Sequence, residues 1–270
     1  MPSTFTNIFS AQVAPRLAVV VCSALMASTA NAEGLQWAVA PYLWAADVSL
    51  DLTVNEDTTI GGDAAFKDLV DKLDTAFMGH LEGRKGRWGM YLDTIYLDLS
   101  DRKSVPVGPG GPILGDLEAD AGMKMKIYDA GGLYRLSHSD AAVQFDLLGG
   151  IRYIDVDIDT LLTLPGPLGN RIDIKTGPSE SDLMLGARAI GRFAERWHWA
   201  LRGDFSMGGS EGTYNGLATV GYTFGESDLF TMTLGYRYMS IEMDGMTQRG
   251  NPTEADTKLS GPILGFVFKF

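Results

Sequence analysis

The sequence has little cysteine, a deficit of positive charge and no long hydrophobic run. Cys22 is the single Cys among 270 residues, so Glu33 to Phe270 can form neither disulfides nor thiolate metal sites. The net charge of -12 argues against a nucleic-acid partner. No stretch beyond residue 33 approaches the roughly 18 consecutive apolar residues of a membrane-spanning helix. We also find no cofactor or metal motif and expect neither ligand.

The N-terminal residues have the composition of an export signal. Arg16 precedes the apolar stretch 17–26, and small residues follow as far as Ala30-Asn31-Ala32. This order predicts a secretory signal peptide at residues 1–32, exported through the Sec pathway and cleaved after Ala32. We expect residues 33–270 to form a single domain.

Alternation of apolar and polar residues recurs through this domain. Between Phe230 and Tyr238 the even-numbered residues are apolar or aromatic, and the odd-numbered ones are Thr, Gly or Arg. Similar alternation occurs in 143–153, 183–189 and 199–206, and a period of two is the side-chain period of a β-strand. An Arg in the middle of so many strands, opposite an aromatic face, favours a membrane β-barrel with a polar interior over a soluble sandwich.

A predicted hairpin gives an independent argument for a polar inner face and an apolar outer face. A two-residue turn at Lys85-Gly86 pairs Arg84 with Arg87 and brings the polar residues of both strands to one face. The opposite face of both strands is then apolar and aromatic. Hairpin register and alternation therefore both predict polar residues inside and apolar residues outside.

The pattern predicts a closed, antiparallel, up-and-down transmembrane β-barrel of about ten strands, with eight or twelve as alternatives. The predicted strands are Gln36–Leu52, Thr75–Arg84, Arg87–Leu99, Glu118–Leu136, Ala141–Asp159, Ser181–Phe193, Trp197–Met207, Thr213–Phe224, Phe230–Glu242 and Lys258–Phe270. Tight turns and both termini are expected at one end, and longer external loops at the other.

Two segments depart from the alternation. In Glu118–Leu136 the polar residues change from even to odd positions, for which we expect a β-bulge between Lys126 and Asp129. In Ala64–Asp74 apolar residues recur at helical spacing, which predicts a short helix in the first external loop. This helix could cap the barrel mouth, fold into the lumen or lie on the membrane surface.

The C-terminal strand and several motifs resemble those of known outer-membrane proteins. The chain ends with Phe266, Phe268 and Phe270 on one face, which resembles the signal recognised by the bacterial barrel-assembly machinery. The motifs Leu234-Gly235-Tyr236-Arg237-Tyr238 and Gly261-Pro262 are similar to those of a family of uncharacterised proteobacterial outer-membrane β-barrels. The resemblance covers nearly all of residues 33–270 and implies a location in the bacterial outer membrane, without implying catalytic residues. We expect outer-membrane lipid, lipopolysaccharide, the barrel-assembly machinery and periplasmic chaperones as partners.

Charged residues on the predicted inner face are the candidate functional residues. This lumen charge network consists of Glu82, Arg84, Asp93, Asp146, Arg152, Arg188, Arg202, Asp204 and Arg237. A buried charge is costly unless it is paired, so we expect mutually neutralising ion pairs, with a selectivity ring or substrate clamp as the alternative. Because a barrel of about ten strands is only slightly wider than one that side chains fill, the lumen should be blocked or narrow.

Three functions are compatible with such a barrel. We expect a structural or narrowly channel-forming protein without enzymatic activity. A hydrolase acting on protein or lipid would instead use His80 with Asp93 or Glu82 as an acid/base pair. A surface adhesin or receptor would act through the external loops, above all Thr160 to Glu180.

Overall fold

Long antiparallel strands account for most of the chain. The computed structural model describes residues 34–54, 58–106, 116–138, 141–163, 171–177, 179–225, 229–246 and 252–270. The elements are β1 (Leu35–Trp44), β2 (Asp47–Val54), β3 (Thr58–Ala64), α1 (Phe66–Val70), β4 (Leu73–Lys85), β5 (Trp88–Pro106), β6 (Asp116–Arg135), β7 (Val143–Thr163), β8 (Arg171–Thr176), β9 (Ser179–Arg192), β10 (Trp197–Gly208), β11 (Gly212–Phe224), β12 (Phe230–Met246) and β13 (Pro252–Lys269). The predicted signal peptide, with Cys22 and Ala30-Asn31-Ala32, lies outside the described residues.

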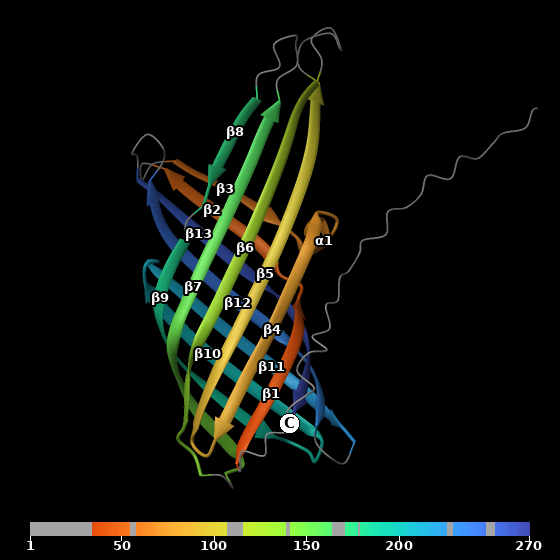
Figure 1. Cartoon of the computed structure of the whole chain (residues 1–270), viewed down its shortest axis with the longest axis vertical. Coiled ribbons are helices and arrows are strands. Elements are labelled where there is room, and N and C mark those ends of the chain that lie inside the picture. Colours follow the sequence, from red (N-terminus) through yellow and green to blue (C-terminus); the bar gives the residue numbers. More distant parts are fainter. Residues whose placement is uncertain are drawn as a thin grey trace, which may run out of the picture. The chain divides into compact units, whose positions relative to one another are not determined.

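These strands close into a barrel (Figure 1). From β4 to β13 each strand of the ring pairs with the next, and β1 closes it by pairing with both β4 and β13. β2 continues β1 after a break at Ala45-Ala46 and also pairs with β13. β1 and β2 together therefore count as one strand of the ring. Over the described residues the prediction of a closed, all-β, ten-stranded antiparallel barrel is confirmed.

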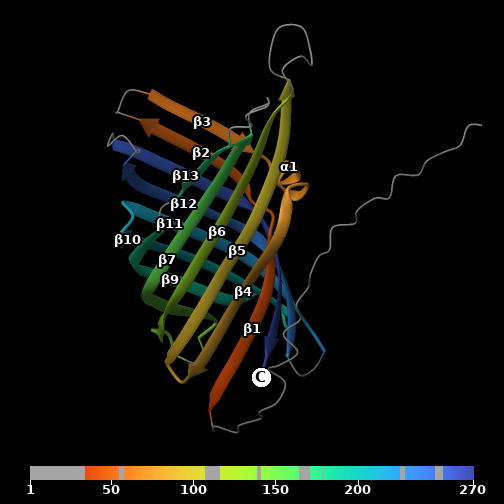
Figure 2. The same ribbon diagram turned by 45° about the horizontal axis from the view of Figure 1, so that its top comes forward.

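The two ends of the barrel differ. The turn end contains the start of β1, the end of β13 and the β4–β5 turn, and the loop end contains α1, β3 and β8 (Figures 1 and 2). At the loop end β3 pairs with β2 and β8 with β7. The sequence pattern predicts loops there and misses these strands, because paired strands can continue past the bilayer, where alternation is no longer required.

The β4–β5 hairpin corrects the predicted register. Lys85 pairs with Trp88 and Arg84 with Gly89, so the turn residues are Gly86 and Arg87. Gly86 has a φ of 61°, which suits the first central position of a hairpin turn. The predicted pairing of Arg84 with Arg87 is therefore wrong by a shift of two residues. An even shift leaves every side chain on its predicted face.

The predicted β-bulge in β6 is absent. β6 pairs with β5 and β7 in continuous register from Glu118 to Tyr134. Lys124 and Lys126 lie on the outer face, whereas Met125 and Ile127 are buried on the inner face. The change in polarity that suggested a bulge arises because this part of the strand has a polar outside and an apolar inside.

The predicted short helix is present but shorter than Ala64–Asp74. α1 spans five residues, and Ala65 at its N-cap supplies no capping side chain. None of its residues is buried, so α1 does not fold into the lumen as a plug. No helix of the described chain is long and apolar enough to cross a membrane.

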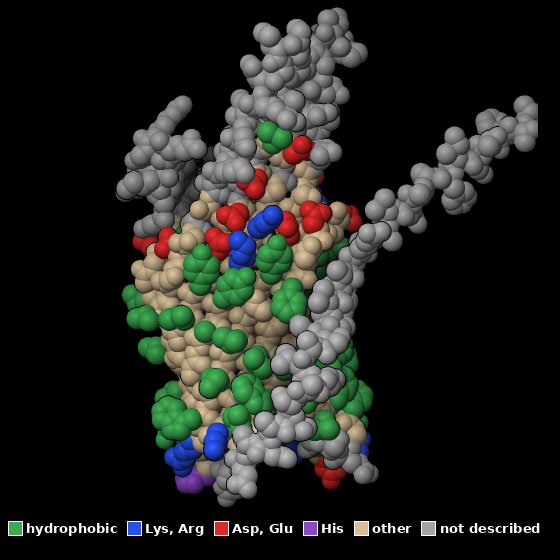
Figure 3. All heavy atoms as spheres, in the orientation of Figure 1, with side chains coloured by type: hydrophobic (Ala, Val, Ile, Leu, Met, Phe, Trp, Pro, Cys, Tyr) green, Lys and Arg blue, Asp and Glu red, His purple; other side chains and the backbone are tan. Residues whose placement is uncertain are grey.

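The outer wall carries apolar side chains from strand to strand. Leu183 and Leu185 on β9 are 72% and 73% exposed. Figure 3 shows hydrophobic side chains over the middle of one face, with charged side chains gathered towards both ends. Phe268 and Phe270 are also exposed, and Phe266 stacks on Phe230. A surface this apolar needs a hydrocarbon environment rather than water.

Candidate lumen site

All nine residues of the predicted lumen charge network lie on inner-face positions of their strands. Glu82 and Arg84 belong to β4, Asp93 to β5, Asp146 and Arg152 to β7, Arg188 to β9, Arg202 and Asp204 to β10, and Arg237 to β12. The contacts of these side chains divide the network into three groups. The central group lies around Arg152, the turn-end group around Asp146, and what we call the upper group around Asp93.

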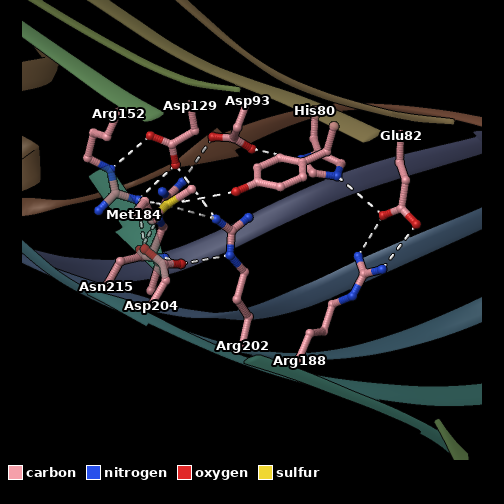
Figure 4. A network of polar contacts seen from close by, with 12 residues as sticks. His80, Glu82, Asp93, Asp129, Arg152, Met184, Arg188, Arg202, Asp204 and Asn215 are labelled. Atoms are coloured by element: carbon pink, nitrogen blue, oxygen red, sulfur yellow. Dashed lines mark hydrogen bonds and ion pairs between the residues drawn. The ribbon is translucent and has the colours of Figure 1, made fainter. Parts of the chain in front are cut away.

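The central group is organised around Arg152, which is completely buried. Its guanidinium donates from Nε and Nη2 to the two oxygens of Asp129, both at 2.8 Å, and from Nη2 to Asp204 Oδ1 at 2.8 Å. Asp204 also accepts from Arg202 Nε at 2.7 Å and from Asn215 Nδ2 at 2.8 Å (Figure 4). The bidentate contact holds Asp129 in a fixed position, and three separate donors do the same for Asp204.

The turn-end group crosses the lumen. Arg188 Nη1 lies 2.6 Å from Glu82 Oε2, and Arg188 Nη2 lies 2.8 Å from Asp146 Oδ2. β5, β6 and β7 separate the strands of Glu82 and Arg188 in the ring, so this ion pair joins distant parts of the wall. Arg84 and Arg135 also bind Asp146, at 3.0 and 2.8 Å. Side chains therefore bridge the interior near the turn end.

The upper group joins β1, β4, β5 and β12. Tyr42 donates to Asp93 Oδ1 at 2.8 Å and accepts from Arg237 Nη1 at 3.0 Å. His80 Nδ1 lies 3.1 Å from Asp93 Oδ2, and His80 Nε2 lies 3.7 Å from Glu82 Oε2. Both ring nitrogens of His80 thus face carboxylates.

Several members of the network were missed from the sequence. Asp129 and Arg135 were left out because the alternation in β6 does not define its phase, although both occupy the same odd positions as buried Leu133. Tyr42 and Asn215 carry no charge, so a pattern of charged residues on the inner face does not include them. Their inward positions follow from the alternation, but no sequence signal predicts their partners.

Much of the loop-end half of the interior is apolar, which corrects the prediction of a polar interior. Asp182, Ser206 and Ser210 form a buried polar cluster at the loop end of β9 and β10. The apolar layer consists of Tyr42, Trp44, Ala46, Met78, Ile95, Met125, Ile127, Ile154, Val156, Met239, Ile241, Met243, Leu259 and Ile263. Met239 and Ile241 are completely buried, so water does not reach them. Apolar side chains occupy inward as well as outward positions in this half, so polarity alone does not identify the inner face there.

A separate charged group lies on the outer face near the loop end. Lys126 Nζ lies 2.7 Å from Asp155 and 3.1 Å from Asp157, and these carboxylates raise the pKa of Lys126. Tyr128 and Tyr153 stack directly below, as aromatic residues do at a membrane interface. Among the described residues, no cluster of His, Asp and Glu is suited to a metal ion.

Comparisons with known proteins add no residue roles. No family model and no curated protein matches the sequence. Similar solved structures include the outer membrane protease OmpT from Escherichia coli, with a TM-score of 0.44 and 8% identity, covering 88% of this chain and 97% of that one. They also include Ail of Yersinia pestis (0.34, 12%, 88% and 99%) and the outer membrane protein OprG from Pseudomonas aeruginosa (0.36, 14%, 88% and 96%). The fold and the lumen define this protein as an antiparallel β-barrel with a side-chain-filled interior.

Proposed function

We propose that the protein is an integral outer-membrane barrel with a structural role, closed to free diffusion and without enzymatic activity. The observation that supports closure is the ion pair between Glu82 and Arg188, whose side chains meet inside the lumen. The distance from Arg188 Nη1 to Glu82 Oε2 is 2.6 Å. Above it, the buried apolar layer presents a second barrier, because hydrated ions avoid an apolar constriction. The six Arg side chains of the network contact five carboxylates, so most of its charge is balanced internally, as expected for structural ion pairs.

The apolar outer wall supports the membrane location. Exposed Leu and aromatic side chains surround a barrel whose backbone hydrogen bonds are made between neighbouring strands around the ring, except where β1 and β4 separate beyond Pro41. Hydrogen bonding of this kind suits a bilayer. The N-terminal segment supports export through the Sec pathway, and the C-terminal Phe residues support insertion by the barrel-assembly machinery. Outer-membrane lipid and lipopolysaccharide are the proposed contacts of the wall.

Conductance in planar bilayers tests the proposed closure. Purified protein is inserted into lipid, and its folded state is verified by the shift in gel mobility on heating. We expect no discrete current steps from protein that passes this check. Regular, reproducible steps would show a continuous aqueous pore and would refute the closed barrel.

The hydrolase alternative is favoured by one observation, the position of His80 between two carboxylates. Asp93 and Glu82 engage its two ring nitrogens, however, and the ring stacks on Tyr91. A general base needs a free nitrogen within reach of the substrate proton. Protease and lipid-deacylation assays on wild type and His80→Ala should therefore give the same background. Activity that is lost in the variant would establish the enzyme.

A further inference from the structure

Strand pairing is interrupted on one side of the loop-end half of the barrel. The pairing between β1 and β4 ends at Pro41 opposite Gly79. Beyond this pair, β2 pairs with β3 instead of β4, and both lean away from β4 in Figure 2. Residues 42–47 and 73–78 therefore border a gap in the strand pairing of the described chain, which we call the side seam. Along the chain, α1 lies between β3 and the border at 73–78, and its first residue, Phe66, donates a hydrogen bond from its backbone N–H to Asp47 of the other border.

The local sequence explains where the seam begins. Pro41 has no N–H group and cannot donate to the ladder, so a strand pair readily ends there. β13 passes close to the break between β1 and β2, since a Cβ atom at Gly261 would collide with the carbonyl group of Ala45. This close approach keeps β1 and β2 paired with β13 while β2 turns away from β4.

The seam opens at a depth where the outer wall is apolar. Leu43 and Phe77, which point outward from its two borders, are 56% and 48% exposed. Phe66 and Val70 of α1 are also exposed. Open sheet edges are avoided in hydrocarbon because their N–H and C=O groups lack partners. A seam retained at this depth therefore calls for a compensating role.

The apolar layer lies directly behind the seam. Tyr42, Trp44 and Met78 come from the bordering strands and belong to this layer. The layer is also rich in Met, with Met125 and Met239 among its members. Methionine is unbranched and adaptable, so a layer of this kind can repack around an inserted chain.

We propose that the apolar layer is a binding site for an unbranched hydrocarbon chain, which enters from the bilayer through the side seam. α1 closes the seam, held by a hydrogen bond from the Phe66 N–H to Asp47 Oδ1 at 2.7 Å. Met78 and Trp44 line the entrance, and Arg237, 5.0 Å from the Trp44 ring, forms the polar floor. Two hydrogen-bonding groups of the layer lie on the bordering strands: the Tyr42 hydroxyl, which is already engaged, and the Trp44 indole N–H, which is buried without a partner in the described chain. The rest of the layer is apolar, so the site suits a narrow, flexible hydrocarbon chain.

Fluorescence quenching of Trp44 tests the site. A variant that keeps Trp44 and replaces the other four Trp residues by Phe is reconstituted in lipid vesicles. 1-Bromododecane supplies a free hydrocarbon chain, and phosphatidylcholine with brominated acyl chains supplies a lipid one. We expect saturable quenching of Trp44 by at least half with one of these probes, and the probe that succeeds identifies the source of the chain.

Two variants at α1 test the route of entry. The backbone N–H of Phe66 binds the side chain of Asp47, so Asp47→Cys and Phe66→Cys place two thiols beside this contact. Once a thiol assay verifies that oxidation has joined them, Trp44 quenching should fall at least fivefold, with recovery after dithiothreitol. Asp47→Ala releases α1 and should speed quenching severalfold, which keeps the test valid if the double variant does not fold. Absent or non-saturable quenching of Trp44, or quenching that neither variant changes, would overturn the proposal.

The inference rests on the proposed membrane location, which a matched control reports separately. A variant that keeps only Trp88, which is 69% exposed on the outer wall, should be quenched by brominated lipid whether or not α1 is locked. Quenching of Trp88 without quenching of Trp44 would overturn the binding site alone. Failure to quench either residue would overturn the membrane location as well.

Discussion

Replacing Arg152 by Met should destabilise the barrel more than any other single truncation in the central group. The guanidinium of Arg152 is completely buried and makes three hydrogen bonds of 2.8 Å to Asp129 and Asp204. Met has a similar length but supplies no charge, so both carboxylates lose a cation while they remain buried. Arg202 stays near them, at 3.6 Å from Asp129 and 2.7 Å from Asp204. One guanidinium then has to serve two carboxylates.

The expected loss of unfolding free energy depends on the carboxylates of Asp129 and Asp204, which stay buried in the variant. Removing one partner of a buried ion pair typically costs about 3–5 kcal/mol, which corresponds to roughly two to four orders of magnitude in the unfolding equilibrium constant. Adding Asp129→Asn removes one of the unpaired charges. The double variant Arg152→Met with Asp129→Asn should therefore be more stable than Arg152→Met alone, which is the signature of direct coupling.

Urea unfolding in lipid vesicles, followed by Trp fluorescence, measures this difference. Lys126→Met is the matched control, because Lys126 also binds two carboxylates but does so on the outer face. Exposed ion pairs contribute little, so this variant should unfold at the same urea concentration as wild type. If Arg152→Met were no less stable than Lys126→Met, the central group would be open to water and the argument for a filled lumen would fail.

Two further predictions concern packing and neutral hydrogen-bonding groups. Gly186→Ala would place a Cβ atom 2.5 Å from that of Asp204 and should cost about 1–3 kcal/mol in the same unfolding assay, whereas Gly203→Ala, with open space around its Cβ, should leave the midpoint unchanged. Equal midpoints for the two variants would contradict the close approach at Gly186. Tyr42→Phe removes the hydroxyl that accepts from Arg237 and donates to a carboxylate, and it should cost about 1.5–3 kcal/mol. An unchanged midpoint for Tyr42→Phe would mean that water replaces this hydroxyl and reaches the upper group.

Sequence reasoning was accurate where only the direction of a side chain mattered. Asp146 and Arg152 share a face because they are an even number of residues apart on one extended strand, whatever the strand pairs with. For the same reason the hairpin error at Gly86 left the inner and outer faces unchanged. The assignment of inner and outer faces from the sequence failed in β6. There the outward Lys126 and the inward Met125 reverse the usual polarity of a barrel wall.

The sequence by itself determined where most strands of the ring lie and, outside β6, the face that each side chain occupies, because the alternation of side chains is a local property of an extended chain. Only the tertiary structure decided that Glu82 meets Arg188, that an apolar layer fills much of the loop-end interior and that β1 separates from β4 beyond Pro41. Each of these depends on how the strands are staggered around the ring, which sets the height at which distant side chains meet. Stagger is the sum of many pairings between strands, and no single segment of the sequence encodes it.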